Sequence, residues 1–187
     1  MCASRVRRSV VAIATAGLLG FAGPGCASSD DPPEPAPLPS ETPSPSRSTA
    51  AAPSLPPSAE GANARALKAF ARHYFDVINY AIATGDTAAV REFASPRCES
   101  CNAIAKSIDT VYDNGGHIES EGWRINYLRY LGKRGANRVI SIGVFLSPET
   151  IVSADGSVDR NEGGKQPMMM LVSTDRGSRV EGLDLVT

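Results

Sequence analysis

The 187-residue sequence is poor in the residues that build metal centres, and it has no excess of charge of either sign. It contains four cysteines, two histidines and one tryptophan, and its 19 Lys and Arg nearly balance its 20 Asp and Glu. A sequence with balanced charge lacks the excess of basic residues that is typical of nucleic-acid-binding domains. A structural zinc site would need two pairs of ligands, and two histidines give only weak support for a second pair. We therefore expect no nucleic-acid partner, no metal and no other cofactor.

The first 25 residues have the pattern of an export signal. A basic run ending at Arg8 is followed by an uncharged stretch from Ser9 to Ala22. This stretch is shorter than the roughly 20 apolar residues of a membrane-spanning helix, and it suits the apolar core of a signal peptide. Gly25 then precedes Cys26, which is followed by small, polar and acidic residues.

This pattern resembles the signal of bacterial lipoproteins, in which a small residue precedes a cysteine that is acylated. Gly23 and Pro24 depart from the residues usual at their positions. The resemblance implies a signal peptide over residues 1–25, lipid such as palmitate on Cys26, and a location on the extracytoplasmic face of the bacterial cell membrane. Two acyl chains hold a protein stably at a membrane, where one does not. The alternative is an ordinary cleaved signal, which leaves Cys26 as a free thiol.

Residues 26–61 have the composition of a tether. Pro, Ser and Ala dominate the segment, and large apolar side chains are almost absent from it. Such a segment buries too little surface to offset its chain entropy, so we expect it to be disordered and extended. A polyproline-like chain of this length reaches on the order of 100 Å.

Residues 62–187 have a common size for one domain with one core. Apolar residues recur at helical spacing over residues 67–82, and Gly85 supplies the C-terminal stop of this first helix. A short second helix is predicted over residues 90–94. A third helix is predicted with Ser95 as its N-cap and Pro96 at its first helical position, and it ends within residues 113–116.

Beyond the third helix the apolar period changes to two. Trp123, Ile125 and Tyr127 alternate with polar residues, and further strands are predicted over residues 139–146, 168–173 and 180–186. Residues 153–166 read as a long polar loop. Helices followed by a meander predict an α+β domain, with the N-terminal helices packed on one face of a curved antiparallel sheet.

This order of elements resembles the nuclear-transport-factor-2-like cone fold, which ketosteroid isomerases and many binding domains share. More narrowly, the stretch YFDVINYAIATGD at residues 74–86, with a C-x-x-C after it, is similar to a family of uncharacterised actinobacterial lipoproteins. That family is known only as a domain of unknown function. The resemblance implies a lipoprotein of the cell envelope and brings no activity and no site residues.

Cys98 and Cys101 are the first candidate site. If Cys2 leaves with the signal peptide and Cys26 carries lipid, these two form an isolated pair, which in an exported domain predicts a disulfide. Their spacing in a first helical turn suits the Cα separation that a disulfide requires. A redox centre and half of a zinc site are the alternatives, although a zinc site needs a second pair of ligands.

A cavity between the first helix and the concave sheet is the second candidate site. The predicted lining is Tyr74, Tyr80, Trp123, Tyr127, Phe145 and the methionines at 168–170, and the same side chains also read simply as core. His73 and Asp76 would supply a general base there, although a pair at this spacing is often a solvated surface contact. Residues 155–161 and 162–166 match calcium and phosphate loops only in part.

The favoured hypothesis is a non-catalytic envelope lipoprotein, anchored in the membrane by its lipid, which binds an envelope protein or a small apolar ligand. It rests on the predicted anchor and tether, and on the lack of an evident acid, base and nucleophile set. An isomerase- or hydrolase-like enzyme that uses the cone pocket is one alternative. A thiol–disulfide redox protein that uses Cys98 and Cys101 is the other.

Overall fold

The computed structural model describes residues 51–186. The predicted signal peptide, the acylation of Cys26 and the tether up to residue 50 lie outside the described residues. The end of the predicted tether is described, and it includes the 3-10 turn η1 (Pro57–Ala59), in which Ala59 is fully buried. Leu55 also packs against the core. The packed chain therefore begins before Ala62, the start predicted from composition, because these two apolar side chains dock a Pro-rich segment.

Three helices follow η1, as their apolar spacing predicts: α1 (Ala64–Thr84), α2 (Ala88–Phe93) and α3 (Glu99–Asp113). The Asn63 side chain caps α1 by accepting hydrogen bonds from the backbone N–H groups of Arg65 and Ala66, at 3.0 and 2.9 Å. Gly85 ends α1 at φ +77°, a left-handed conformation that glycine adopts without strain. Within residues 51–186, no helix has the length and the apolar character needed to cross a membrane.

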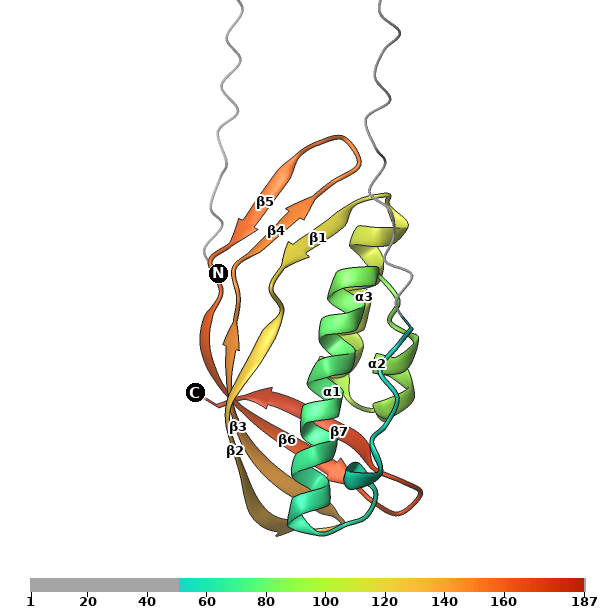
Figure 1. Ribbon diagram of the computed structural model, residues 1–187, viewed down its shortest axis with the longest axis vertical. Helices are drawn as coiled ribbons and strands as arrows, with labels where there is room; N and C mark the ends of the chain where they lie inside the picture. Colours follow the sequence, from blue (N-terminus) through green and yellow to red (C-terminus); the bar gives the residue numbers. More distant parts are fainter. Residues whose placement is uncertain (1–50, 187) are drawn as a thin grey trace, which may run out of the picture. The chain divides into compact units, whose positions relative to one another are not determined.

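The remainder of the domain forms two antiparallel sheets (Figure 1). The larger sheet has the strand order β2-β3-β6-β7, and the smaller has the order β1-β4-β5. The strands are β1 (His117–Ser120), β2 (Trp123–Arg134), β3 (Asn137–Leu146), β4 (Glu149–Val152), β5 (Val158–Asn161), β6 (Gly164–Ser173) and β7 (Arg179–Leu185). The α+β class, with N-terminal helices packed on an antiparallel sheet, is therefore confirmed.

The smaller sheet differs from the sequence expectation. The stretch predicted as a polar loop over residues 153–166 contains β5, which pairs with β4. The turn between them is closed by the Ser153 N–H, which donates to the Ser157 carbonyl at 2.9 Å. Every residue of β5 is exposed, so it has no alternation of buried and exposed positions from which a strand could be predicted.

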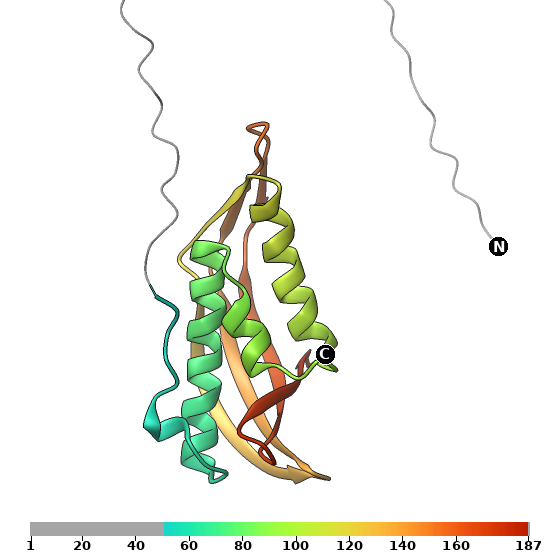
Figure 2. The same ribbon diagram turned by 90° about the vertical axis from the view of Figure 1, so that its right-hand side faces the viewer.

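The helices cover one face of the larger sheet (Figures 1 and 2). Phe70, Tyr74 and Ile78 of α1 are fully buried, and so are Ile142 of β3 and Met170 of β6. All five belong to one continuous core. Each large apolar side chain buried in this way contributes about 1.5–3 kcal/mol to folding. Side chains from both layers thus fill the space between α1 and the sheet.

Candidate functional site

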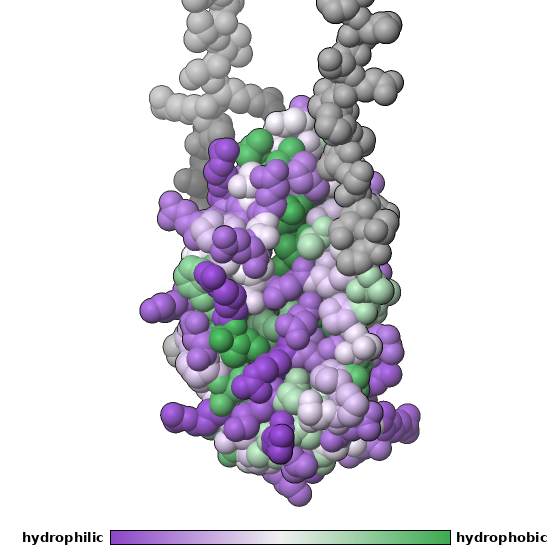
Figure 3. All heavy atoms as spheres, in the orientation of Figure 1, coloured by the Kyte–Doolittle hydropathy of each residue, from purple (hydrophilic) through white to green (hydrophobic). Residues whose placement is uncertain are grey.

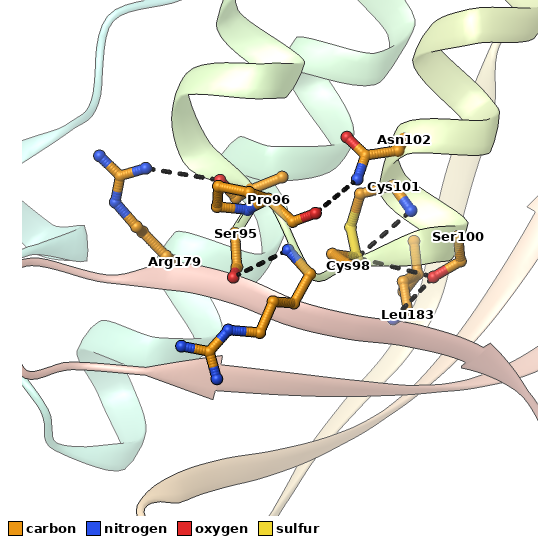
Figure 4. The surroundings of a disulfide bond; sticks show 10 residues. Ser95, Pro96, Cys98, Ser100, Cys101, Asn102, Arg179 and Leu183 are labelled. Carbon is orange, nitrogen blue, oxygen red and sulfur yellow. Dashed lines mark hydrogen bonds between the residues drawn. A yellow bond between two sulfur atoms is a disulfide. The ribbon is translucent and has the colours of Figure 1, made fainter.

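The predicted disulfide between Cys98 and Cys101 is confirmed, and it closes the first turn of α3 (Figure 4). The two Cα atoms lie 5.2 Å apart. Cys98, and not the predicted Ser95, is the N-cap of the helix, and its Sγ accepts a hydrogen bond from the Cys101 N–H at 3.2 Å. The Ser100 hydroxyl accepts a hydrogen bond from the Leu183 N–H at 3.1 Å. The bridged turn is therefore fixed directly to β7.

The surroundings of the disulfide favour a covalent staple over a redox centre. Cys98 is 0% exposed and Cys101 is 1% exposed. Thiol–disulfide exchange requires an attacking thiolate to reach one of the sulfurs, and this burial blocks its approach. The segment before the pair is helix α2 followed by a single bridge between Ala94 and Val180. A thioredoxin-like motif would instead follow a strand of a βαβ unit.

Tyr74, the first of the predicted pocket residues, lies inside the filled core. Its side chain is fully buried, and its hydroxyl has no hydrogen-bond partner among residues 51–186. Burial raises the pKa of Tyr74 well above the ordinary value of a phenol, because the phenolate would lose its hydration. Tyr74 is therefore neutral at physiological pH, which makes it a poor general base and favours a packing role.

His73 and Asp76 do not form the catalytic dyad considered for the cone pocket. The His73 ring is buried edge-on to Phe93, with ring centroids 4.8 Å apart, and its Nε2 has no partner among the described residues. Burial lowers the pKa of His73, and the charge of Asp76 partly opposes this shift. Asp76 is exposed, and no ion pair within residues 51–186 joins it to His73. Partial desolvation raises the pKa of Asp76, and His73 lowers it.

A β-bulge moves Tyr127 out of the predicted cavity. Ile125 pairs with Val144 and Tyr127 pairs with Gly143, so the register shifts between these two residues of β2. Since Val144 and Gly143 are neighbours on β3, Ile125 and Tyr127 point to opposite faces of the sheet. Tyr127 is 48% exposed. The simple alternation predicted for β2 is thus wrong at this point.

The outer face of the sheet places Tyr127 over a glycine. A Cβ on Gly143 would overlap the Tyr127 ring, so only glycine permits this close approach. Phe145, two residues further along β3, lies on the same outer face, and the guanidinium of Arg124 sits 5.1 Å from its ring centroid. Neither Tyr127 nor Phe145 therefore lines the space beneath α1, which corrects the sequence prediction for both.

The remaining predicted pocket residues are also separated from one another. Trp123 is half-buried against Phe75, with ring centroids 6.2 Å apart. The hydroxyl of Tyr80 donates to the Asp86 carboxylate at 3.4 Å, outside the core. Met168 and Met170 are buried, whereas Met169 is half-buried on the outer face. The predicted lining residues thus do not surround one common cavity.

Two surface grooves, here called the Tyr127 grooves, take the place of that cavity. The first has a volume of about 450 Å³ and lies between α1 and β2, with Asp76 and Trp123 among its walls. The second, of about 410 Å³, lies on the outer face of the sheet beside Gly143 and Pro167. Asn126 and Tyr127 line both. Figure 3 shows that the apolar surface on the face with α1 and β2 is divided into small patches by hydrophilic side chains.

Asn79 fixes the first groove, and sequence reasoning missed it. Its amide nitrogen donates to the Trp123 carbonyl at 3.0 Å, and its Oδ1 accepts from the Trp123 N–H at 2.7 Å. These two hydrogen bonds hold the start of β2 against α1. In the sequence Asn79 is only one more polar residue on the hydrophilic side of a helix, and its partner lies 44 residues away. Within the described range, no three His, Cys, Asp or Glu side chains are grouped so as to hold a metal ion.

Comparison with known proteins shows the family of this chain. Residues 27–137, more than half of the chain, match the model of a family of unknown function, DUF6318, and the chain belongs to that family. The match includes the helices and ends at the start of β3. The search of curated proteins found no match.

Several solved structures are similar to the domain. The intermembrane-space region of the chloroplast protein ARC6 has 7% identity and a TM-score of 0.48, over 68% of this chain and 98% of that one. An uncharacterised protein with a cystatin-like fold from Caulobacter vibrioides has 12% identity and a TM-score of 0.42, over 65% and 87%. A protein named Rd1NTF2_04 with a long sheet has 18% identity and a TM-score of 0.34, over 62% and 99%.

Proposed function

Because the chain belongs to a family of unknown function, we propose from its own residues that it is a non-catalytic binding module of the bacterial cell envelope. A lipid on Cys26 anchors it to the extracytoplasmic face of the membrane, and residues 27–50 tether the folded domain to that anchor. The observation that carries the proposal is the filled space beneath α1, where an enzyme built on this architecture would need its pocket.

The positions of the candidate catalytic groups support the same conclusion. Tyr74 is buried in the core, His73 is packed on Phe93, and Asp76 faces the groove on the surface. General acid–base catalysis requires such groups within hydrogen-bond reach of one substrate. A packed core beside an open surface groove suits binding better than catalysis.

The shape of the Tyr127 grooves favours a protein as the partner over a small apolar ligand. A small ligand needs a concave site that buries most of its surface. The Tyr127 grooves are open, and they flank an exposed aromatic side chain, a residue type enriched where proteins bind one another. Arg72 and Asp76 at the rim of the first groove supply charges of both signs for a polar partner.

The first test addresses the anchor. In cells that express the full chain, Cys26→Ser should move the protein from the membrane fraction to the soluble fraction, and incorporation of a palmitate label should cease. A protein that stays in the membrane fraction with equal labelling would exclude Cys26 as the lipid site.

The second test addresses the grooves. A photo-crosslinking amino acid at Asn126, which lines both grooves, should give one crosslinked envelope protein in living cells. The matched control places the same amino acid at Asp159, an exposed residue of β5 in the other sheet. Equal crosslinking from the two positions, or none from Asn126, would show that the grooves are not the binding surface.

A further inference from the structure

A polar hollow of about 670 Å³ lies at the end of the larger sheet, away from the Tyr127 grooves. The β2–β3 hairpin and the turn between β6 and β7 meet at this end, as Figure 1 shows for the lower part of the molecule. Arg97, Arg176 and Arg179 line the hollow, together with Asn137, Asp175 and Glu181. Arginines from two segments far apart in the sequence therefore converge on one depression.

Within the described part of the chain, these three arginines have no ion-pair partner. All three are exposed, and among the ion pairs within residues 51–186 none involves them. The Arg179 guanidinium donates to the Ala94 carbonyl at 3.4 Å, which holds its position at the wall of the hollow. A guanidinium presents several N–H donors in a rigid fork, and those not used within the protein are available to an oxyanion.

The neighbouring strands add positive charge at the same end. Residues 122–148, which form β2 and β3, contain five basic residues and no Asp or Glu. Three of the five, Lys133, Arg134 and Arg138, are at the β2–β3 hairpin, whose residue Asn137 lines the hollow. The two acids of the hollow, Asp175 and Glu181, are thus outnumbered. Although the chain is nearly neutral, the end of the larger sheet that holds the hollow therefore has an excess of basic side chains and a positive potential.

We propose that this hollow binds a phosphate group through Arg97 and Arg176, with Arg179 beside them. Phosphate oxygens match the fork of a guanidinium, and arginine is favoured wherever such planar, two-point recognition is needed. The phosphate belongs either to the headgroup of an anionic lipid or to a soluble phosphate compound. The site is separate from the Tyr127 grooves, so either proposal stands or fails without the other.

The test uses two probes and the full chain, with Cys26→Ser in every sample so that no acyl chain holds the protein to a vesicle. One probe is inorganic pyrophosphate, measured by titration calorimetry. The other is a vesicle of phosphatidylcholine with phosphatidylglycerol, measured by co-sedimentation against vesicles of phosphatidylcholine alone. The test variant is Arg97→Gln with Arg176→Gln. The control is Lys106→Gln with Arg160→Gln, which changes the net charge equally at exposed positions away from the hollow.

Each arginine at an anionic surface changes the affinity about fivefold, so the test variant should bind about 25-fold more weakly. The control variant should keep its affinity within about twofold, and both should unfold at the temperature of the parent. Binding of vesicles alone identifies a lipid headgroup as the source of the phosphate, and binding of pyrophosphate alone identifies a soluble compound. An equal loss in both variants would overturn the proposal, and so would a parent that binds neither probe.

Discussion

Replacing Tyr74 by Phe should make the domain more stable. The Tyr74 hydroxyl is buried and has no hydrogen-bond partner among the described residues. Burying a polar group without a partner costs about 1–3 kcal/mol, whereas the aromatic ring alone belongs in this core. Tyr74→Phe removes the hydroxyl and keeps the ring, so the free energy of unfolding should rise by about 1 kcal/mol. With a urea m-value of about 2 kcal/mol/M, the midpoint should rise by about 0.5 M.

Tyr112→Phe provides a matched control with the opposite sign. The Tyr112 hydroxyl donates to the Ile82 carbonyl at 2.6 Å and accepts from the Ile118 N–H at 3.4 Å. The same loss of one oxygen should therefore lower the free energy of unfolding by about 1 kcal/mol. Both variants are measured by urea unfolding, with the fluorescence of Trp123, the single tryptophan, as the signal. If Tyr74→Phe were as destabilising as Tyr112→Phe, the buried Tyr74 hydroxyl would have a hydrogen-bond partner in the core. That result would contradict the expected gain in stability.

Three further predictions concern stability. Because burial lowers the pKa of His73, the folded domain favours the neutral ring. Stability should therefore be full above about pH 6.5 and should fall as the pH is lowered below that value, and a His73→Phe variant should lose this slope in thermal unfolding. Replacing Cys98 and Cys101 by Ala should lower the free energy of unfolding by about 2 kcal/mol, and reductant should add nothing in that variant; an unchanged urea midpoint would show that the bridge constrains little. Gly143→Ala should cost about 1 kcal/mol because its Cβ meets the Tyr127 ring. In the Tyr127→Ala background this cost should shrink, and strict additivity in that double-mutant cycle would contradict the contact.

The helical half of the domain could be predicted because its signals are local. The apolar spacing of α1, the stop at Gly85 and the bridge in the first turn of α3 all depend on residues within a few positions of one another. The predicted export signal and the even pair of cysteines favoured a disulfide over the other uses of Cys98 and Cys101. The docking of Ala59 was not predictable, because a single small side chain in a Pro-rich segment has no pattern of its own.

The fold distributes charge unevenly, although the sequence as a whole is nearly neutral. Basic and acidic residues nearly balance in total, and the total contains no information about where each sign gathers. The antiparallel pairing of β2 and β3 brings Lys133, Arg134 and Arg138 together at one hairpin. The turn from Asp175 to Ser178 then returns the chain to the same end, with Arg176 inside the turn and Arg179 directly after it. The site proposed for phosphate thus depends on strand pairing between distant segments.

The predicted pocket was wrong because an alternation of apolar and polar residues in the sequence contains no information about β-bulges. Trp123, Ile125 and Tyr127 alternate in the sequence as if they shared one face. One extra residue in β2 reverses the side on which the next residues lie, up to a second register shift between Tyr130 and Gly132, and it does so without changing composition or hydrophobicity. The reversal is stable here because Gly143 leaves room for the Tyr127 ring on the outer face. The same bulge that empties the predicted cavity of Tyr127 therefore places an aromatic ring on the surface, where a partner protein could bind it.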